Sequence, residues 1–377
     1  MNTSISWRNR ALAGVCAVAL ASSCIAVAGC APNDPSNPQQ TSSASTAASE
    51  TRTITVDGID YTIPAQVTKV APTIGALNEI TMMLTAGEDS RVAATATSQV
   101  TDAFKRVIPS YEQSNPNNYD ASDVEQMIEA GVQVAYGVKS AYSDEQLQQM
   151  ADAGIVFIPM NNLSTVDGIC ETTETIGQIL GDEEYDRAKQ FTSYWKANVA
   201  DCQARTSGLD ESEKPTVLNL SYSNGAFTTE AGASLISSYI DAAGGKSLSE
   251  DYTSSAQSSG QGKAGAIVDE EQIVAWNPDY IITYSAEATD AILSDSALSN
   301  VKAVAEGHVY TAPKGLYLWS VRSGEGAMMA PWIGTKIHPD LFGDVDMTAM
   351  VKDFFSQYYD YALSDEEAAQ VLAGTFK

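Results

Sequence analysis

The chain has 377 residues, of which 44% are hydrophobic and 18% are charged, a balance typical of globular proteins that excludes a chain disordered throughout. Forty-eight acidic residues against 21 basic ones give a formal net charge of −27 at pH 7, which repels the phosphate backbone of nucleic acids. We therefore expect no nucleic-acid partner. The length suggests two domains, and the charge says little about the fold.

The first thirty residues predict export followed by lipidation. Arg8 and Arg10 precede an apolar stretch that ends in small residues, which is the pattern of an export signal. This stretch is shorter than the ~20 apolar residues of a membrane-spanning helix. Residues 27–30, Val-Ala-Gly-Cys, resemble the lipobox of bacterial lipoproteins, in which the cysteine becomes the first residue and carries a diacylglycerol. We expect a signal peptide over residues 1–29 and a lipid on Cys30, which anchors the protein outside the cell membrane.

The segment after the lipobox predicts a flexible tether over residues 30–50, because it is rich in Pro, Ser, Thr and Ala and has no apolar periodicity. Once the signal is removed, Cys170 and Cys202 are the cysteines left for redox or metal chemistry. Two cysteines make no disulfide framework, and we expect two buried free thiols.

The globular part begins with two β-rich runs, residues 53–56 and 59–63, around an Asp-Gly pair that suits a tight hairpin turn. Strands and helices then alternate, which predicts crossover connections and a mostly parallel sheet. The expected strands cover residues 67–70, 91–96, 132–137 and 155–160, and the expected helices cover residues 73–84, 122–130 and 143–153.

A long helix separates this region from a second alternating one. Residues 182–205 lack Gly and Pro and carry large apolar side chains three or four positions apart. The second region predicts strands over residues 216–221, 280–284 and 309–311, helices over 233–243, 269–275 and 326–337 with a kink at Pro331, and a surface loop over 247–265. The predicted fold class is therefore α/β, with two Rossmann-like lobes (residues 51–181 and 207–377) joined by one long interlobe helix (182–206).

Candidate ligand residues are aromatic and polar side chains in the loops expected to follow strand ends, where open α/β sheets bind ligands. Each residue alone is typical of packing or of a loop, and it is their joint placement that suggests a cleft between lobes. The candidates are Tyr111, Tyr136, Tyr222, Asn224, Phe227, Tyr284, Tyr317, Trp319 and Arg322.

The sequence offers few of the residues that catalysis or a bound metal ion would need. The chain has two histidines, His308 and His338, so a zinc site with three imidazoles is impossible. No G-x-S-x-G element offers a serine nucleophile for a histidine-dependent triad. We expect neither an enzyme nor a cofactor, although carboxylate pairs stay open until they are placed in space.

The order of elements resembles the iron-complex and cobalamin branch of periplasmic substrate-binding proteins, which feed ABC importers. The resemblance covers nearly all of residues 51–377. It rests on the lipobox, the hairpin and the two lobes around a long helix. It also rests on short segments similar to recurring sequence motifs of that family: residues 123–128, 132–135, 151–158, 242–246, 268–282 and 307–310. It implies a rigid, largely pre-formed interlobe cleft, an importer permease and ATPase as partners, and, we expect, a monomer.

In this family one glutamate at the tip of each lobe meets arginines of the importer, and the matching residues are Glu125 and Glu271. Residues 122–125 also read as a capping box, and Glu271 also suits a helix N-terminus, so a purely structural role stays open for both.

The resemblance implies an iron complex (a ferric siderophore or haem) or a corrinoid as cargo. Relatives that take anionic siderophores often line the cleft with several arginines, whereas the basic candidates here are Arg322, Lys314 and Lys139. Two alternatives remain. Arg322 could hold an oxyanion such as molybdate, or the cleft could belong to a ligand-sensing module for a membrane receptor.

Overall fold

The computed structural model describes residues 50–85, 91–252 and 265–377. The predicted signal peptide, the lipidated Cys30 and nearly all of the predicted tether lie outside these residues, as does most of the loop predicted over 247–265. In the described part of the chain, no helix is both long enough and apolar enough to cross a membrane.

The expected hairpin opens the described part. β1 (Thr51–Val56) pairs antiparallel with β2 (Ile59–Pro64), and the turn residues Asp57 and Gly58 adopt positive φ angles of 52° and 75°. Two consecutive residues at positive φ favour Asp-Gly, so the sequence prediction is confirmed.

Lobe one has a parallel three-stranded sheet in the order β3 (Val70–Pro72), β4 (Val134–Gly137), β5 (Val156–Pro159). The strand predicted over residues 67–70 thus lies slightly later, and the strand predicted over 91–96 is wrong. Val92 and Thr95 form only isolated bridges, because the alanines around them have little side chain to pack on a sheet. The helices are α1 (Gly75–Leu84), α2 (Asp102–Val107), α3 (Ser110–Ser114), α4 (Val124–Ala130), α5 (Asp144–Asp152) and α6 (Val166–Leu180).

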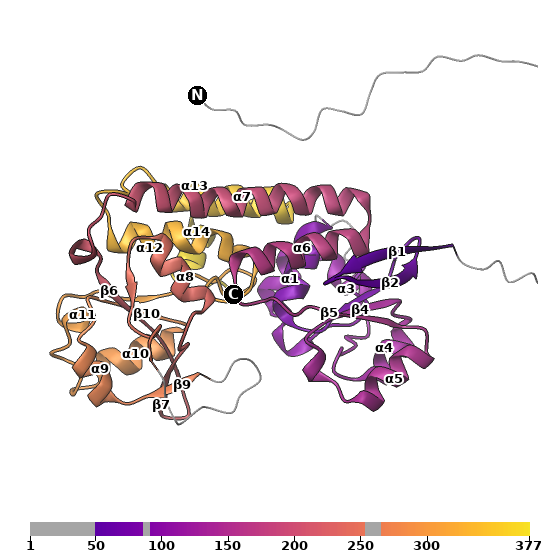
Figure 1. The fold of residues 1–377 in the computed structure, drawn as a ribbon, viewed down its shortest axis with the longest axis horizontal. Coiled ribbons are helices and arrows are strands. Elements are labelled where there is room, and N and C mark those ends of the chain that lie inside the picture. The colour runs from indigo at the N-terminus through magenta and orange to yellow at the C-terminus, as the bar shows by residue number, and fades with distance from the viewer. Residues whose placement is uncertain (1–49, 86–90, 253–264) are drawn as a thin grey trace, which may run out of the picture. The chain divides into compact units, whose positions relative to one another are not determined.

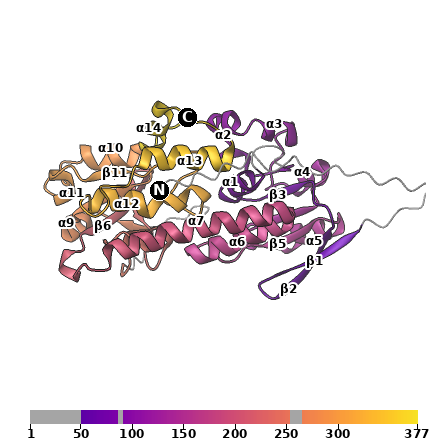
Figure 2. The same ribbon diagram turned by 90° about the horizontal axis from the view of Figure 1, so that it is seen from above.

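The long interlobe helix is confirmed as α7 (Asp182–Thr206), whose 25 residues extend about 37 Å at the usual helical rise. Figure 1 shows α7 running from one lobe to the other, and Figure 2 shows its length from above. It packs along α6, and the two helices meet at Gly181. Cys170 on α6 and Cys202 on α7 are buried free thiols, as predicted.

Lobe two has a sheet in the order β11 (Val309–Thr311), β10 (Tyr280–Thr283), β6 (Thr216–Ser223), β7 (Ala226–Thr229), β9 (Ala266–Val268), and β8 (Lys246–Ser247) also pairs with β6. β8, β10 and β11 run parallel to their neighbours, whereas β7 is antiparallel to both β6 and β9. The sheets are therefore mostly parallel, and the α/β fold class with two lobes is confirmed.

The helices of lobe two are α8 (Leu235–Ala242), α9 (Glu270–Trp276), α10 (Ala286–Ser294), α11 (Lys302–Ala305), α12 (Met329–Ile337), α13 (Met347–Tyr359) and α14 (Asp365–Leu372). The kink expected at Pro331 is absent. The α-helix begins only at Met329, after the 3₁₀ segment η4 (Gly324–Met328), so Pro331 lies in the first turn, where a missing N–H costs nothing. α13 and α14 were not predicted.

The two lobes share one hydrophobic core. A single cluster of buried side chains includes Leu77 of α1, Trp195 of α7, Trp319 of lobe two and Phe355 of α13. Helix α13 packs against α1, so the C-terminal helices close back onto lobe one. This continuous core fixes the relation of the two lobes without loose connecting strands.

Candidate functional site

Four of the nine predicted ligand residues are core side chains. Tyr111, Tyr136, Phe227 and Trp319 have exposed fractions of 1%, 0%, 4% and 0%. The Tyr136 hydroxyl lies 2.6 Å from Thr81 Oγ1 inside lobe one, and the Tyr111 ring packs edge-on against Phe104. A ring enclosed on both faces offers no surface to a ligand, so the expectation that these four stack on cargo is not supported. Burial of these large rings stabilises the fold by removing apolar surface from water. Their expected position in loops gave no sign of this burial.

The second group lies on the β6–β7 hairpin. Asn224 is exposed at the turn with a φ of 52°, next to Gly225 with 78°, which makes it a turn residue first. The partly exposed Tyr222 ring contacts Phe227 with 4.9 Å between ring centroids. Tyr284, after β10, is partly exposed, and its hydroxyl accepts from Asn219 Nδ2 over 3.4 Å. Burial raises the pKa of Tyr284 well above its usual value, so it is a neutral phenol.

Tyr317 lies where the two lobes meet. Its hydroxyl donates to Oε1 of Gln99, in lobe one, over 2.8 Å. The same Gln99 oxygen accepts the backbone N–H of Gly75, the first residue of α1, over 2.9 Å. Gln99 and Gly75 were missed from the sequence, because no periodicity marks Gln99. A Gly that opens a helix directly after a strand was the available signal for Gly75.

Arg322 is the cation beside this contact. Its side chain is partly exposed and forms no hydrogen bond or ion pair within the described residues. Burial raises the pKa of Tyr317, and the positive charge of Arg322 opposes that rise, which places the guanidinium close to the phenol. A guanidinium without a carboxylate partner is suited to bind an anion in bidentate fashion.

The start of α1 adds to the positive potential here. Its N-cap, Ile74, has no side chain that accepts a hydrogen bond, and its first turn contains no acidic residue. The partial positive charge of the helix N-terminus is therefore not offset by an acidic side chain in this turn. Gly75, Gln99, Tyr317 and Arg322 together form what we call the interlobe site. It comprises two of the nine predicted residues and two that the sequence did not indicate.

The two predicted docking glutamates occupy equivalent positions on short helices. Asp123 caps α4 by accepting from the N–H groups of Glu125 and Gln126, and Asp269 caps α9 by accepting from that of Gln272. Glu125 and Glu271 are each the second residue of their helix and are exposed. The alternative that residues 122–125 form a capping box is wrong, because the cap is Asp123 and not Ser122.

Helices α4 and α9 resemble each other in more than the position of their glutamates. Three residues after each glutamate stands an exposed aliphatic side chain, Ile128 with 40% and Val274 with 47% of its surface exposed. Between them, Met127 and Ile273 are fully buried and hold each helix on its lobe. Each lobe therefore presents a glutamate and an aliphatic side chain on one short helix, a pair we call the docking pair of that lobe.

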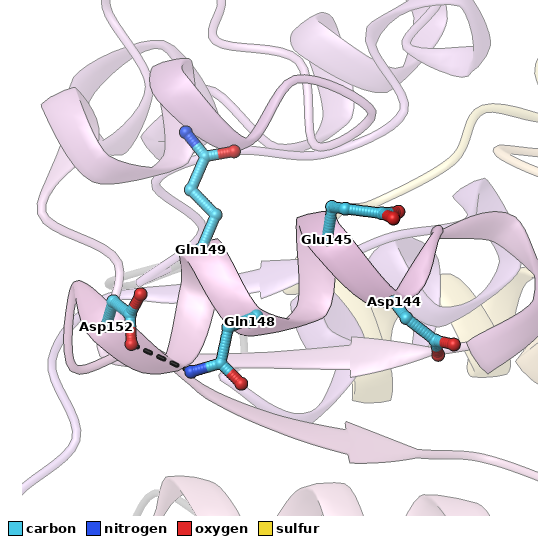
Figure 3. Close-up of a pocket in the computed structure, with 5 residues that line it drawn as sticks. All are labelled: Asp144, Glu145, Gln148, Gln149 and Asp152. Carbon is cyan, nitrogen blue, oxygen red and sulfur yellow. Dashed lines mark hydrogen bonds between the residues drawn. The ribbon is translucent and has the colours of Figure 1, made fainter.

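Two surface depressions lie elsewhere and include none of the nine candidates. One follows the exposed face of α5, and Figure 3 shows its lining residues, Asp144, Glu145, Gln148, Gln149 and Asp152. The second lies at the start of the lobe-two strands, where the His308 ring stacks on Tyr280 with centroids 4.6 Å apart. Within the described residues, no group of three or more His, Cys, Asp or Glu side chains is arranged to hold a metal ion.

The chain belongs to the periplasmic binding protein family, whose family model matches residues 78–316. This family consists of transport proteins that bind solutes. The chain is accordingly a substrate-binding protein of an ABC transporter, a class that works outside the cytoplasm with a permease and an ATPase.

Individual relatives support the same class. The chain is 25% identical over 286 residues to an uncharacterized ABC transporter substrate-binding lipoprotein, YvrC of Bacillus subtilis, covering 75% of this chain and 84% of that protein. It is 26% identical over 103 residues to the molybdate-binding protein MolA of Haemophilus influenzae, covering 26% of this chain and 29% of that protein.

Solved structures show the same fold. A periplasmic solute-binding protein from Veillonella parvula superposes with a TM-score of 0.67 at 23% identity, over 86% of this chain and 97% of that one. The structure of MolA bound to molybdate superposes with a TM-score of 0.64 at 18% identity, over 83% of this chain and 99% of that one.

Proposed function

We propose that this protein captures an anionic metal solute at the interlobe site and delivers it to an ABC importer. The observation that carries this proposal is Arg322, a partly exposed guanidinium without a carboxylate partner among the described residues, beside Tyr317 and the N-terminus of α1. Positive charge from both lobes then converges on one bound anion.

A ferric siderophore with negative charge is the first candidate cargo, because it combines an iron centre with anionic oxygen ligands that Arg322 and Tyr317 can bind. Haem and corrinoids are supported less, because four of the aromatic side chains expected to stack on them lie in the core. An oxyanion of molybdate type is the second candidate. It is favoured by the small polar character of the interlobe site and by the similarity to MolA.

Cargo entry requires the Tyr317–Gln99 hydrogen bond to open, because it closes the contact between the lobes at this point. Both groups then become available to the ligand, and the cost of opening is small, since a hydrogen bond between neutral groups contributes about 1 kcal/mol. The continuous core of the two lobes keeps the remaining movement small, so capture needs only a local opening of the interlobe site.

Delivery, in this proposal, uses the two docking pairs. Glu125 and Glu271 supply the negative charge that meets arginines of the permease, and Ile128 and Val274 supply apolar contact next to each charge. Anchoring through a lipid on Cys30 would keep the protein near its importer, as the lipobox predicts.

The test is a titration of the purified protein, followed by tryptophan fluorescence, against ferric siderophores of several charges, haem, cobalamin and molybdate. Saturable one-to-one quenching by an anionic chelate or by molybdate supports the proposal and separates its two candidates. Tight binding of cobalamin, or no binding of any anion by protein shown to be folded, would reject it. Binding of a ligand in this titration, without importer-dependent uptake of that ligand by cells, would instead favour the ligand-sensing module.

A further inference from the structure

Two glutamates from different lobes lie fully buried around one tyrosine. Glu79 of α1 and Glu325 of η4 are both 0% exposed, and Tyr359, the last residue of α13, is 2% exposed. The Tyr359 hydroxyl is within hydrogen-bond distance of Glu79 Oε1 and lies 3.1 Å from Glu325 Oε1. Glutamates are almost never buried to this extent without a compensating charge, so the cluster needs an explanation.

The two carboxyl groups have no cationic partner in the described part of the chain. Within the described residues, neither Glu79 nor Glu325 forms an ion pair. On the elements that pack around them, Arg187 of α7 donates to the backbone carbonyls of Met83 and Gln357, and Arg322 faces Tyr317. Lys352 of α13 pairs with Asp365 instead, and Tyr317 on the loop and Tyr358 and Tyr359 on α13 contribute phenols. Protonation is therefore the available way to reduce the buried negative charge.

Counting protons assigns the charge states. A phenol has one proton and can donate to only one of its two carboxyl neighbours, so the other contact must be donated by a protonated carboxyl group. Glu325 also accepts from the N–H groups of Leu316 at 2.7 Å, Gly315 at 2.9 Å and Trp319 Nε1 at 2.8 Å. Three further donors suit an ionised carboxylate. Glu79 accepts only two such donors, the N–H groups of Gly324 and Glu325, so it is the carboxyl group better suited to hold the proton and donate to Tyr359, which then donates to Glu325.

The pKa values agree with this assignment. Burial, together with the negative charge of Glu325, raises the pKa of Glu79 to about 8. Burial raises the pKa of Glu325 to about 7, and its hydrogen bonds from Leu316, Trp319 and Tyr359 oppose the rise. Both carboxyl groups of this coupled pair therefore hold protons more tightly than ordinary glutamates do.

The cluster also holds the loop of residues 313–323, which we call the ligand loop because it carries Tyr317 and Arg322. Glu325 binds the backbone of this loop at Gly315 and Leu316, and Glu79 Oε2 accepts the N–H of Gly324, directly after the loop, over 2.7 Å. The approach is close enough to require glycine, because a β-carbon on residue 315 would lie 2.3 Å from Glu325 Oε2. The bond from Gly324 to Glu79 thus ties lobe two to α1 of lobe one.

We propose that Glu79, Tyr359 and Glu325 share one dissociable proton and act as a proton-dependent lock that holds the ligand loop against lobe one. When the Glu79 O–H bond breaks and the proton passes to solvent, two carboxylates face each other across a hydroxyl that can satisfy only one of them. Their repulsion loosens the ligand loop and, through Tyr317, the contact between the lobes. The lock requires no ligand, so it stands apart from the proposed cargo.

The test measures hydrogen-exchange protection of the Gly315, Leu316 and Gly324 amides between pH 6 and pH 9, corrected for intrinsic exchange. In the wild type, protection should fall by up to about tenfold for each pH unit above the shared pKa. In Glu79→Gln, whose neutral amide can also donate to Tyr359, protection should not depend on pH. The Ile281 amide, which donates to His308 O in the lobe-two sheet, is the internal control. Equal protection at pH 6 and pH 9 in the wild type, or the same decline in Glu79→Gln, overturns the lock.

Infrared spectroscopy tests the shared proton directly. It uses the wild-type protein, so the result does not depend on whether a variant folds. Wild-type protein should show the carbonyl band of a protonated carboxyl group at pH 7, which should disappear at pH 9.5. Absence of this band at pH 7 overturns the proposal. The Tyr359→Phe variant provides a second comparison, because it removes the hydroxyl that links the two glutamates and should change the pH at which the band is lost. None of these measurements uses cargo, so their failure leaves the transport proposal intact.

Discussion

Gly75 and Tyr317 lie so close together that a β-carbon on residue 75 would stand 2.8 Å from the Tyr317 ring and 1.9 Å from Gln99 Oε1. The absence of a side chain at the first position of α1 therefore allows lobe one and lobe two to touch. This contact is the point at which the interlobe site is closed, and it can be opened by a single methyl group.

The Gly75→Ala variant should lose the hydrogen bonds that Gln99 makes with Gly75 and Tyr317, because Gln99 is displaced. We expect a loss of about 1 kcal/mol in the free energy of unfolding, measured by urea denaturation. In a Gln99→Ala background, which already lacks these bonds, adding Gly75→Ala should cost less than it does in the wild type, because only the close contact with the Tyr317 ring is left to relieve.

Gly208→Ala is the matched control, because nothing lies within 4 Å of a β-carbon there. It should leave stability unchanged within a few tenths of a kcal/mol. Additive losses from Gly75→Ala and Gln99→Ala would contradict the account of the contact.

Arg322→Gln should weaken binding of an anionic cargo about 10- to 100-fold, since a hydrogen bond to a charged group contributes about 1.5–3 kcal/mol. Affinity is measured by the same fluorescence titration as for the wild type. Lys246→Gln removes an exposed charge in β8 and serves as the control, which should bind almost normally. Equal losses in both variants would indicate a general effect of net charge and not a site at Arg322.

Charge reversal at both docking pairs, Glu125→Arg with Glu271→Arg, should abolish importer-dependent uptake while cargo affinity stays unchanged. The physical reason is that both carboxylates are exposed and the caps of their helices are provided by Asp123 and Asp269, so reversal does not disturb the fold. Uptake of labelled cargo by cells and affinity of the purified protein are the two measurements.

The control for this experiment reverses two exposed glutamates on other helices, Glu171→Arg on α6 and Glu366→Arg on α14. It changes net charge by the same amount and should transport normally. Normal uptake by the Glu125/Glu271 variant would remove these residues from docking.

Cys170 and Cys202 should not react with a thiol reagent at pH 8 while the protein is folded. Both side chains are fully buried, and burial raises the pKa of each thiol to about 12, so the reactive thiolate is scarce at pH 8. Peptide mapping by mass spectrometry should show labelling of both residues only after unfolding in urea. A Ser193→Cys variant, exposed on α7, should be labelled in the native state and confirms that the reagent is active. Native-state labelling of Cys170 would contradict the packing of α6 on α7.

Much of the fold followed from local sequence. Residues 182–205 contain apolar side chains at helical spacing and no Gly or Pro, so the interlobe helix was predictable from periodicity alone. Asp57 and Gly58 predicted the hairpin because few other residue pairs accept two positive φ angles. Arg322 was chosen as a candidate because an arginine among aromatic residues in a loop points to a ligand, and its role stays a prediction.

Some elements escaped prediction because their signals are weak or ambiguous. Helix α6 contains three threonines and two internal glycines, which lower helix propensity, and its helical form is stabilised by packing on α7. Residues 91–96 contain β-branched side chains typical of a strand, but the neighbouring alanines support only isolated bridges.

The sequence by itself determined the alternation of strands and helices, the long helix and the acidic helix tips, because each depends on residues that are neighbours along the chain. Only the tertiary structure decided which aromatic residues lie in the core, that Gln99 meets Tyr317 from 218 positions away, and that Glu79 faces Glu325 around Tyr359. Every residue of α1 is buried, so periodicity could not show which side of this helix would carry a charge. The position of Glu79 depends on long-range packing of α13 and η4 against α1, and no local pattern encodes such a contact.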